Sequence, residues 1–179
     1  MYVNNDNMVG DALRQGDIIS GIHILGAINL TGIEYTKDIR DEVTGWSVHK
    51  KPDIQEVMVL SHSCEIAREN GVKLTSIILA PLRDINTATE PGKIEELISS
   101  NILREGIEVS YLKYFYIQPN DRLRFPNGAV VDFSKLFSVR KNSYNYLLER
   151  KILQLTEETA SSMSLKFAVY IHRNIPQAA

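Results

Sequence analysis

Apolar residues along this chain occur mostly in short runs separated by polar segments and turn residues. The segments 56–61 and 74–82 contain near-continuous apolar runs with β-branched residues, which is typical of buried strands in the middle of a sheet. Weaker patterns predict further strands, over 18–30, 111–118, 123–125, 129–132, 136–139 and 150–155. Asn127-Gly128 predicts a hairpin turn between 123–125 and 129–132, and Pro126 favours an edge position.

Two segments show the 3.6-residue period of a helix. The first covers 93–104, and Gly106 fits its C-terminal end. The second begins after Thr156, a suitable N-cap, and continues to Arg173. Its predicted buried face holds five apolar residues: Ala160, Met163, Phe167, Ala168 and Ile171.

Short strands with turn signals, and helices that do not alternate regularly with them, predict a mainly β fold with added helices. We expect a partly open antiparallel barrel with a C-terminal helix. A chain of 179 residues fits a single domain, 1–179, with a barrel core at about 15–82 and 111–173. A helical insertion is expected at about 83–110. The polar segment 31–55 predicts a long surface loop, with a short strand at Trp46-Ser47-Val48.

Composition narrows the class of protein. An apolar content of 44% and a charged content of 23% are ordinary for a globular domain. The net charge of −2 argues against a broad basic face that coats itself with nucleic acid. The single cysteine rules out an internal disulfide and suits a reducing compartment. No signal-peptide pattern or membrane-length apolar run is visible, so we expect a cytoplasmic bacterial or phage protein with no membrane partner.

Reactive side chains follow the predicted strand at 56–61. Ser61, His62, Cys64 and Glu65 are the candidate catalytic residues, because a strand end can present functional side chains on a rigid base. Cys64 is a candidate nucleophile of a thiol hydrolase, or else a small buried side chain. His62 is a candidate general base or acid, or else a histidine satisfied by a loop carbonyl. Glu65 can orient His62, bind a cation or cap a turn.

A metal site would need these residues to converge with distant histidines, namely His23, His49 or His172. The chain has no Cys-x2-Cys or His-Glu-x-x-His spacing, so we predict no metal. It also has no Walker A or Gly-x-Gly-x-x-Gly pattern, and no cofactor is predicted.

Basic and aromatic residues in the second half suggest a surface for single-stranded RNA, on which bases would stack. They are Arg122, Arg124, Arg140, Lys141, Tyr114 and Tyr116. The alternative is a solvated charged face over core aromatics. The candidate substrate-binding residues of the chain are Asp17, Arg83, Arg122 and Arg140, although Asp17 also fits a turn position.

The order of these segments resembles the PemK/MazF class of prokaryotic toxins, which have an SH3-like barrel. Residues 15–19 (Gln-Gly-Asp-Ile-Ile) resemble the start of the family's first strand, and 57–61 resemble its second strand, which ends in a serine. Residues 77–82 resemble its third strand, and 130–158 its closing strands and final helix. Gln55-Glu56 stand where the family usually carries Arg-Pro, and Leu82-Arg83 where a Thr or Ser normally follows the third strand.

The resemblance implies a small intracellular toxin-like or defence-associated protein that binds or cleaves RNA. In this hypothesis His62 moves protons, and an arginine such as Arg83 or Arg140 stabilises charge on the phosphate. The altered positions motivate the alternative of a non-catalytic interaction module, acting as a partner subunit or adaptor. The expected partners are RNA, a protein encoded nearby, and a second copy of the chain in a homodimer.

Overall fold

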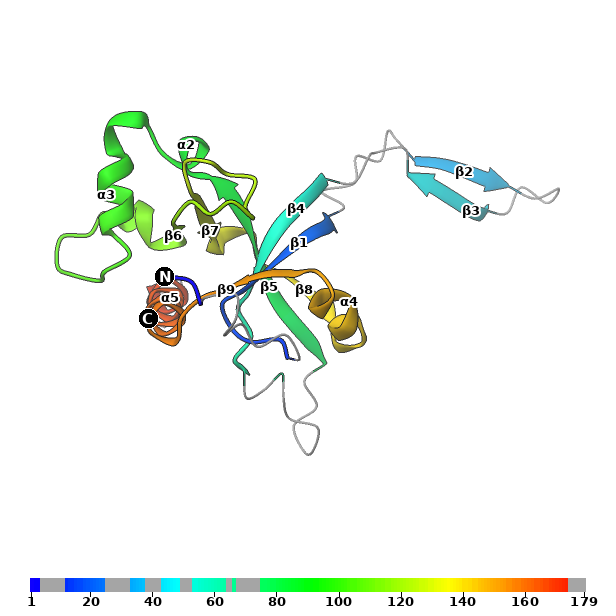
Figure 1. Cartoon of the computed structure of the whole chain (residues 1–179). Coiled ribbons are helices and arrows are strands. Elements are labelled where there is room, and N and C mark those ends of the chain that lie inside the picture. The colour runs from blue at the N-terminus through cyan, green and yellow to red at the C-terminus, as the bar shows by residue number, and fades with distance from the viewer. Residues whose placement is uncertain are drawn as a thin grey trace, which may run out of the picture. The chain divides into compact units, whose positions relative to one another are not determined.

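The computed structural model describes residues 1–3, 12–24, 33–37, 43–48, 53–63, 66 and 75–173 (Figure 1). The chain divides into two compact units. One comprises 1–20 together with 56–179, and the other comprises 21–55.

The main sheet has seven strands: β1 (Asp17–Ile24), β4 (Asp53–Val59), β5 (Ser76–Asp84), β6 (Tyr114–Ile117), β7 (Ala129–Asp132), β8 (Phe137–Arg140) and β9 (Lys151–Gln154). Their order is β6-β7-β5-β4-β1-β9, and β8 also pairs with β5. β5 is long enough to pair with β8 through residues 76–79 and with β7 through residues 82–84, both antiparallel. The sheet curls into a partly open antiparallel barrel, so the predicted mainly β class with added helices is confirmed.

The second unit contains a separate two-stranded antiparallel sheet. β2 (Ile33–Lys37) pairs with β3 (Val43–Val48), with Tyr35 opposite Trp46. The predicted short strand at Trp46-Ser47-Val48 is confirmed as part of β3. The prediction of a loop is wrong over the described residues 33–37 and 43–45, because β-branched and aromatic residues in both strands suit a pleated pair.

The helices are short except for the last. They are α2 (Ile85–Ala88), α3 (Ile94–Ser99), α4 (Tyr144–Leu148) and α5 (Glu157–Arg173), with 3-10 turns η3 (Pro91–Lys93), η4 (Val109–Lys113), η5 (Phe133–Lys135) and η6 (Lys141–Ser143). α5 matches its prediction, and Thr156 Oγ1 accepts a hydrogen bond from Thr159 N at 3.4 Å. The helix predicted over 93–104 is shorter, since its last turn closes at Ser100, whose N–H bonds to Glu96 O.

The hairpin in the second half differs from its prediction. β6 pairs with β7, whereas residues 123–125 lie in the connection between them, so the strand predicted there is wrong. Gly128 closes this connection at a φ of +93°, and a Cβ there would lie 2.8 Å from Ile117 O. Close approach to β6 therefore requires a glycine at the turn that the sequence indicated.

The core of the first unit lies between the curled sheet and α5. Met163 is buried against the sheet, and the rings of Phe133 and Phe167 lie 5.1 Å apart. A smaller apolar cluster under α3 contains Leu97, Tyr111 and Tyr116. These contacts fix α5 against the sheet, and so they also fix the positions of the side chains on either side of its buried face. Among the described helices, none has the length and apolar character needed to cross a bilayer.

Candidate functional site

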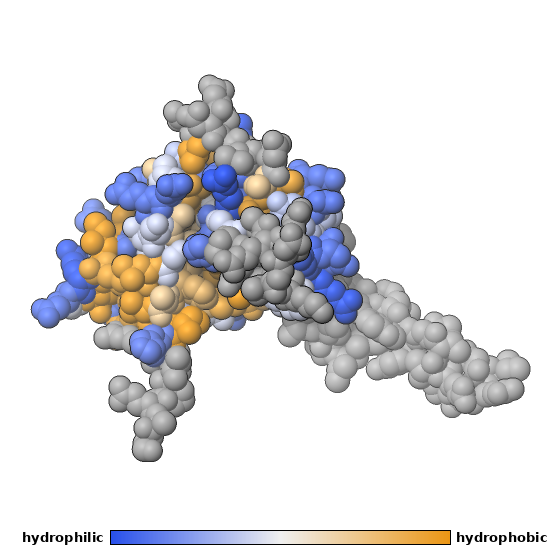
Figure 2. Space-filling model, turned by 90° about the horizontal axis from the view of Figure 1, so that it is seen from below, coloured by the Kyte–Doolittle hydropathy of each residue, from blue (hydrophilic) through white to orange (hydrophobic). Residues whose placement is uncertain are grey.

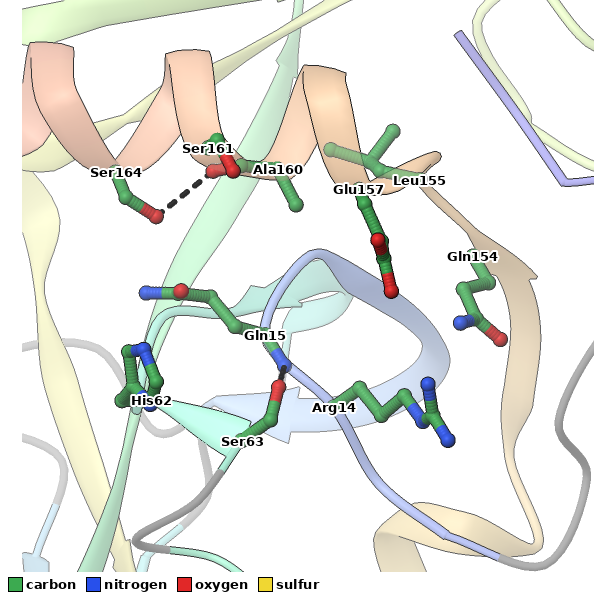
Figure 3. Close-up of a pocket in the computed structure, with 10 residues that line it drawn as sticks. All are labelled: Arg14, Gln15, His62, Ser63, Gln154, Leu155, Glu157, Ala160, Ser161 and Ser164. Atoms are coloured by element: carbon green, nitrogen blue, oxygen red, sulfur yellow. Dashed lines mark hydrogen bonds between the residues drawn. The ribbon is translucent and has the colours of Figure 1, made fainter.

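A polar pocket with a cavity of about 460 Å³ lies where four segments meet (Figure 3). The segment before β1 contributes Arg14 and Gln15, and the segment after β4 contributes His62 and Ser63. The remaining lining residues come from the end of β9 and the first turns of α5: Gln154, Leu155, Glu157, Ala160, Ser161 and Ser164.

Hydrogen bonds join the first two segments and fix the floor of the pocket. Gln15 N donates to Ser63 Oγ at 3.0 Å, and Gln15 Nε2 donates to Leu60 O at 2.7 Å. Ser61 is buried beside them, and its Oγ accepts a hydrogen bond from Ile78 N at 2.9 Å. The predicted catalytic residue Ser61 therefore extends the pairing of β4 with β5 and does not line the pocket.

His62 is exposed at the pocket, where sequence reasoning placed a proton-transfer group. Its carbonyl accepts a hydrogen bond from Ile66 N at 3.1 Å. Figure 3 shows the Gln15 amide reaching towards His62, and the Glu157 carboxylate directed towards the segment with Arg14. An imidazole, a guanidinium and a carboxylate thus border one cavity.

Asp17 lies next to this segment, but it is fully buried and does not line the pocket. Its Oδ2 accepts hydrogen bonds from Arg14 N at 2.7 Å and from Lys151 Nζ at 2.9 Å. Burial raises the pKa of Asp17 to about 6, against the lowering effect of the Lys151 ammonium and the Arg14 N–H. Lys151 Nζ also lies 3.2 Å from Gln154 Oε1 of the pocket. The predicted substrate-binding residue Asp17 therefore supports the backbone that carries Arg14.

The other predicted substrate-binding arginines lie away from this pocket. Arg83 forms an ion pair with Asp132 at 3.1 Å, and Arg122 Nη1 donates to Ile152 O at 3.0 Å. Arg140 is exposed at the end of β8. Tyr114 and Tyr116 of the proposed stacking surface are buried in the cluster under α3, which agrees with their reading as core aromatics.

Two predicted catalytic residues, Cys64 and Glu65, lie outside the described residues, as does His49, and the side chain of His23 also lies outside them. His172 is exposed near the end of α5 and lines a separate, apolar surface hollow. In the part of the chain that the structure describes, no three His, Cys, Asp or Glu side chains are grouped so that they could hold a metal ion.

Sequence reasoning missed Arg14, Gln15, Glu157, Ser161 and Ser164 as site residues. Ser161 and Ser164 are three residues apart on α5, so they share one side of the helix, and that spacing was a usable signal. Nothing in the local pattern indicated Arg14. It reaches the pocket only because β1 pairs with β9 and the chain before β1 crosses the end of β4.

The pocket suits recognition of an anionic group and transfer of a proton. Guanidinium, amide and hydroxyl groups are common donors to phosphate oxygens. An imidazole and a carboxylate are the common proton-transfer groups at neutral pH. A scan against models of protein families finds no match for this chain, and a search of curated proteins finds no significant match.

Proposed function

We propose that the protein binds single-stranded RNA at the polar pocket and cleaves it there, as a toxin-like or defence-associated protein in a prokaryotic cytoplasm. The observation that carries the proposal is the meeting of His62, Arg14 and Glu157 at one cavity from three distant parts of the chain. The partly open barrel supports the resemblance to PemK/MazF toxins, although a fold alone does not carry an activity.

The chemistry needs only groups that the pocket holds. One of His62 and Glu157 removes the proton from the ribose 2′-hydroxyl, whose oxygen attacks the adjacent phosphorus. The bond from phosphorus to the 5′-oxygen breaks, and the other group protonates that oxygen. The products are a 2′,3′-cyclic phosphate and a free 5′-hydroxyl. Arg14 stabilises the negative charge that develops on the phosphate oxygens, in place of the Arg83 or Arg140 that the sequence suggested.

The test is brief induced expression, followed by sequencing of total RNA with mapping of 5′-hydroxyl ends. Wild-type protein is expected to create new ends, and His62→Ala to reduce them by about 100-fold or more, as is typical for loss of a proton-transfer group. His172→Ala is the matched control, since His172 is an exposed histidine outside the pocket. New ends that persist in His62→Ala would overturn this assignment.

Arg14→Ala separates binding from cleavage. With purified protein and a fluorescent single-stranded oligonucleotide, we expect weaker binding and a smaller salt dependence, because one phosphate contact is lost. Wild-type binding without cleavage would favour the alternative of a non-catalytic interaction module, and the search would then turn to its protein partner and to a homodimer. No binding and no cleavage would contradict the RNA proposal, whereas a monodisperse monomer that co-purifies with neither protein nor nucleic acid would contradict the interaction module.

A further inference from the structure

A second, buried site lies on α5, on the side away from the polar pocket. The side chain of Lys166 is completely buried, and its Nζ donates to Ser100 Oγ at 2.7 Å. Ser100 follows α3 and is 2% exposed, and its Oγ donates to Leu97 O at 2.6 Å. Within the described residues, no carboxylate lies within ion-pair distance of Lys166.

A buried ammonium without a counter-ion is unfavourable, so burial favours the neutral amine. Burial lowers the pKa of Lys166 to about 7. The charged side chains on α3, on the segment after it and in η4 are Glu95, Glu96, Arg104, Glu105, Glu108 and Lys113. At neutral pH a large fraction of Lys166 is therefore uncharged, and an uncharged amine can accept a proton from a hydroxyl.

Ser100 also lines a cavity of about 320 Å³, whose other polar lining residues are Glu96, Ser99, Arg104, Glu108 and Tyr111. Ser100 therefore borders a space that can admit a small molecule and also contacts the buried amine. Desolvated lysines beside a nucleophile and a cavity occur at functional sites, whereas a lysine with only a structural role is normally paired or reaches solvent.

We infer that Ser100 and Lys166 form a nucleophile–base pair that hydrolyses a small ester bound in the cavity beside α3. The Ser100 hydroxyl gives its proton to neutral Lys166 Nζ, and Oγ attacks the carbonyl carbon. The bond to the leaving alcohol breaks, and Lys166 returns the proton to that oxygen. Water then gives a proton to Lys166 and attacks the acyl group. Ser100 Oγ leaves and takes the proton back, so the products are an acid and an alcohol.

Arg104 is placed to support this step. Its Nη2 donates to Ser99 Oγ at 3.4 Å, and it lines the same cavity as Ser100. A guanidinium there can stabilise the negative charge on the carbonyl oxygen as Oγ attacks. The residues that line the polar pocket and those that line the cavity beside α3 do not overlap. Either activity can therefore fail without the other.

The test uses the full chain and diisopropyl fluorophosphate, a small probe that phosphorylates activated serines with loss of fluoride. Intact mass and peptide mapping are expected to show one adduct, on Ser100. Labelling should be at least about 100-fold slower in Lys166→Met and absent from position 100 in Ser100→Ala. Ser162→Ala is the matched control, because Ser162 is an exposed serine of α5 that donates to Glu158 O and lines neither of the two cavities. The labelling rate should rise with pH between 6 and 8.

Turnover of p-nitrophenyl acetate should follow the same order among the variants. The proposal is overturned if wild-type Ser100 takes up no probe at pH 8, or if Lys166→Met is labelled at the wild-type rate while its circular dichroism matches that of wild type. The first result does not depend on whether a variant folds. RNA cleavage by Ser100→Ala should remain at the wild-type level.

Discussion

Two buried lysines in the same unit differ in their partners. Lys151, on β9, is 2% exposed and forms a 2.9 Å ion pair with Asp17, with further acceptors at Ala12 O and Gln154 Oε1. Lys166, on α5, is fully buried and donates to a neutral hydroxyl at Ser100. Loss of solvent penalises the ammonium in both places, but only Lys151 gains a carboxylate in return.

The difference indicates separate roles. The Asp17–Lys151 pair ties the segment before β1 to β9 and so holds Arg14 and Gln154 at the rim of the polar pocket. This ion pair therefore has a structural role in supporting the polar pocket. Among the described residues, Lys166 ties α5 to Ser100 at the end of α3 with one hydrogen bond, and a residue chosen only for stability would be apolar there. Each lysine can be tested by removing its partner or its charge.

Asp17→Ala should have the largest effect. It leaves Lys151 buried without its carboxylate, so the free energy of unfolding is expected to fall by about 3–5 kcal/mol, measured by urea denaturation. The double variant Asp17→Leu, Lys151→Met removes both charges and should recover most of that loss. A fall below about 1 kcal/mol in the single variant would show that the ion pair does not hold this end of the sheet.

Regions defined by local sequence signals could be predicted, whereas regions defined by contacts between distant segments could not. β4, β5 and α5 were predicted because their apolar runs and helical period are local signals. β2 was missed because it carries Glu34 and Lys37 within five residues and gains its pairing from β3, of which only the end, at 46–48, was predicted. His62 was found from the cluster of reactive residues at a strand end, whereas Arg14 joins it through pairings between distant segments.

Lys166 was missed for a different reason. It lies three residues after Met163, within the stripe that packs on the rest of the unit, and the pattern was read from the apolar members alone. Ala168 and Ile171, which were assigned to the buried face, are in fact exposed. Figure 2 shows hydrophobic residues gathered on one part of the surface. The exposed large apolar side chains of α5 are Leu165 and Ile171. A charged residue inside an apolar stripe was the available signal.

Lys166→Met should raise stability, in contrast to the same substitution at Lys151. Methionine matches the lysine stem in length and removes a buried charge, so we expect a gain of about 1–4 kcal/mol at pH 6. Lys151→Met leaves Asp17 without its counter-ion and should cost about 3–5 kcal/mol. Urea denaturation of both variants under one condition gives the comparison directly. Destabilisation by both would place Lys166 in the same structural class as Lys151.

The pH dependence of stability should separate the two regions as well. The pKa of Lys166 is about 7 in the folded protein against 10.5 for the free side chain, so the unfolded chain binds more protons between these values. Stability should therefore rise with pH from about 7, by roughly 1–2 kcal/mol up to pH 9 relative to Lys166→Met. The pKa of Asp17 is about 6 in the folded protein against 3.8 for the free side chain, so the folded protein binds more protons between these values. The contribution of Asp17 to the free energy of unfolding therefore falls as pH rises from about 4 to 6. A flat difference between wild type and Lys166→Met would contradict the lowered lysine pKa.

Ser100→Ala should have the smallest effect, and its pH dependence carries the information. At pH 6 the charged Lys166 loses its hydroxyl partner, and we expect a loss of about 1–2 kcal/mol in the free energy of unfolding. At pH 9 the amine is neutral in the folded protein, so the loss should be smaller. Ser99→Ala, at a half-buried neighbour, should stay within about 0.5 kcal/mol at both values. An equal loss at both pH values would mean that Ser100 contributes packing alone. A loss confined to the acidic side would show that its hydroxyl responds to the proton on Lys166, which the nucleophile–base pair requires.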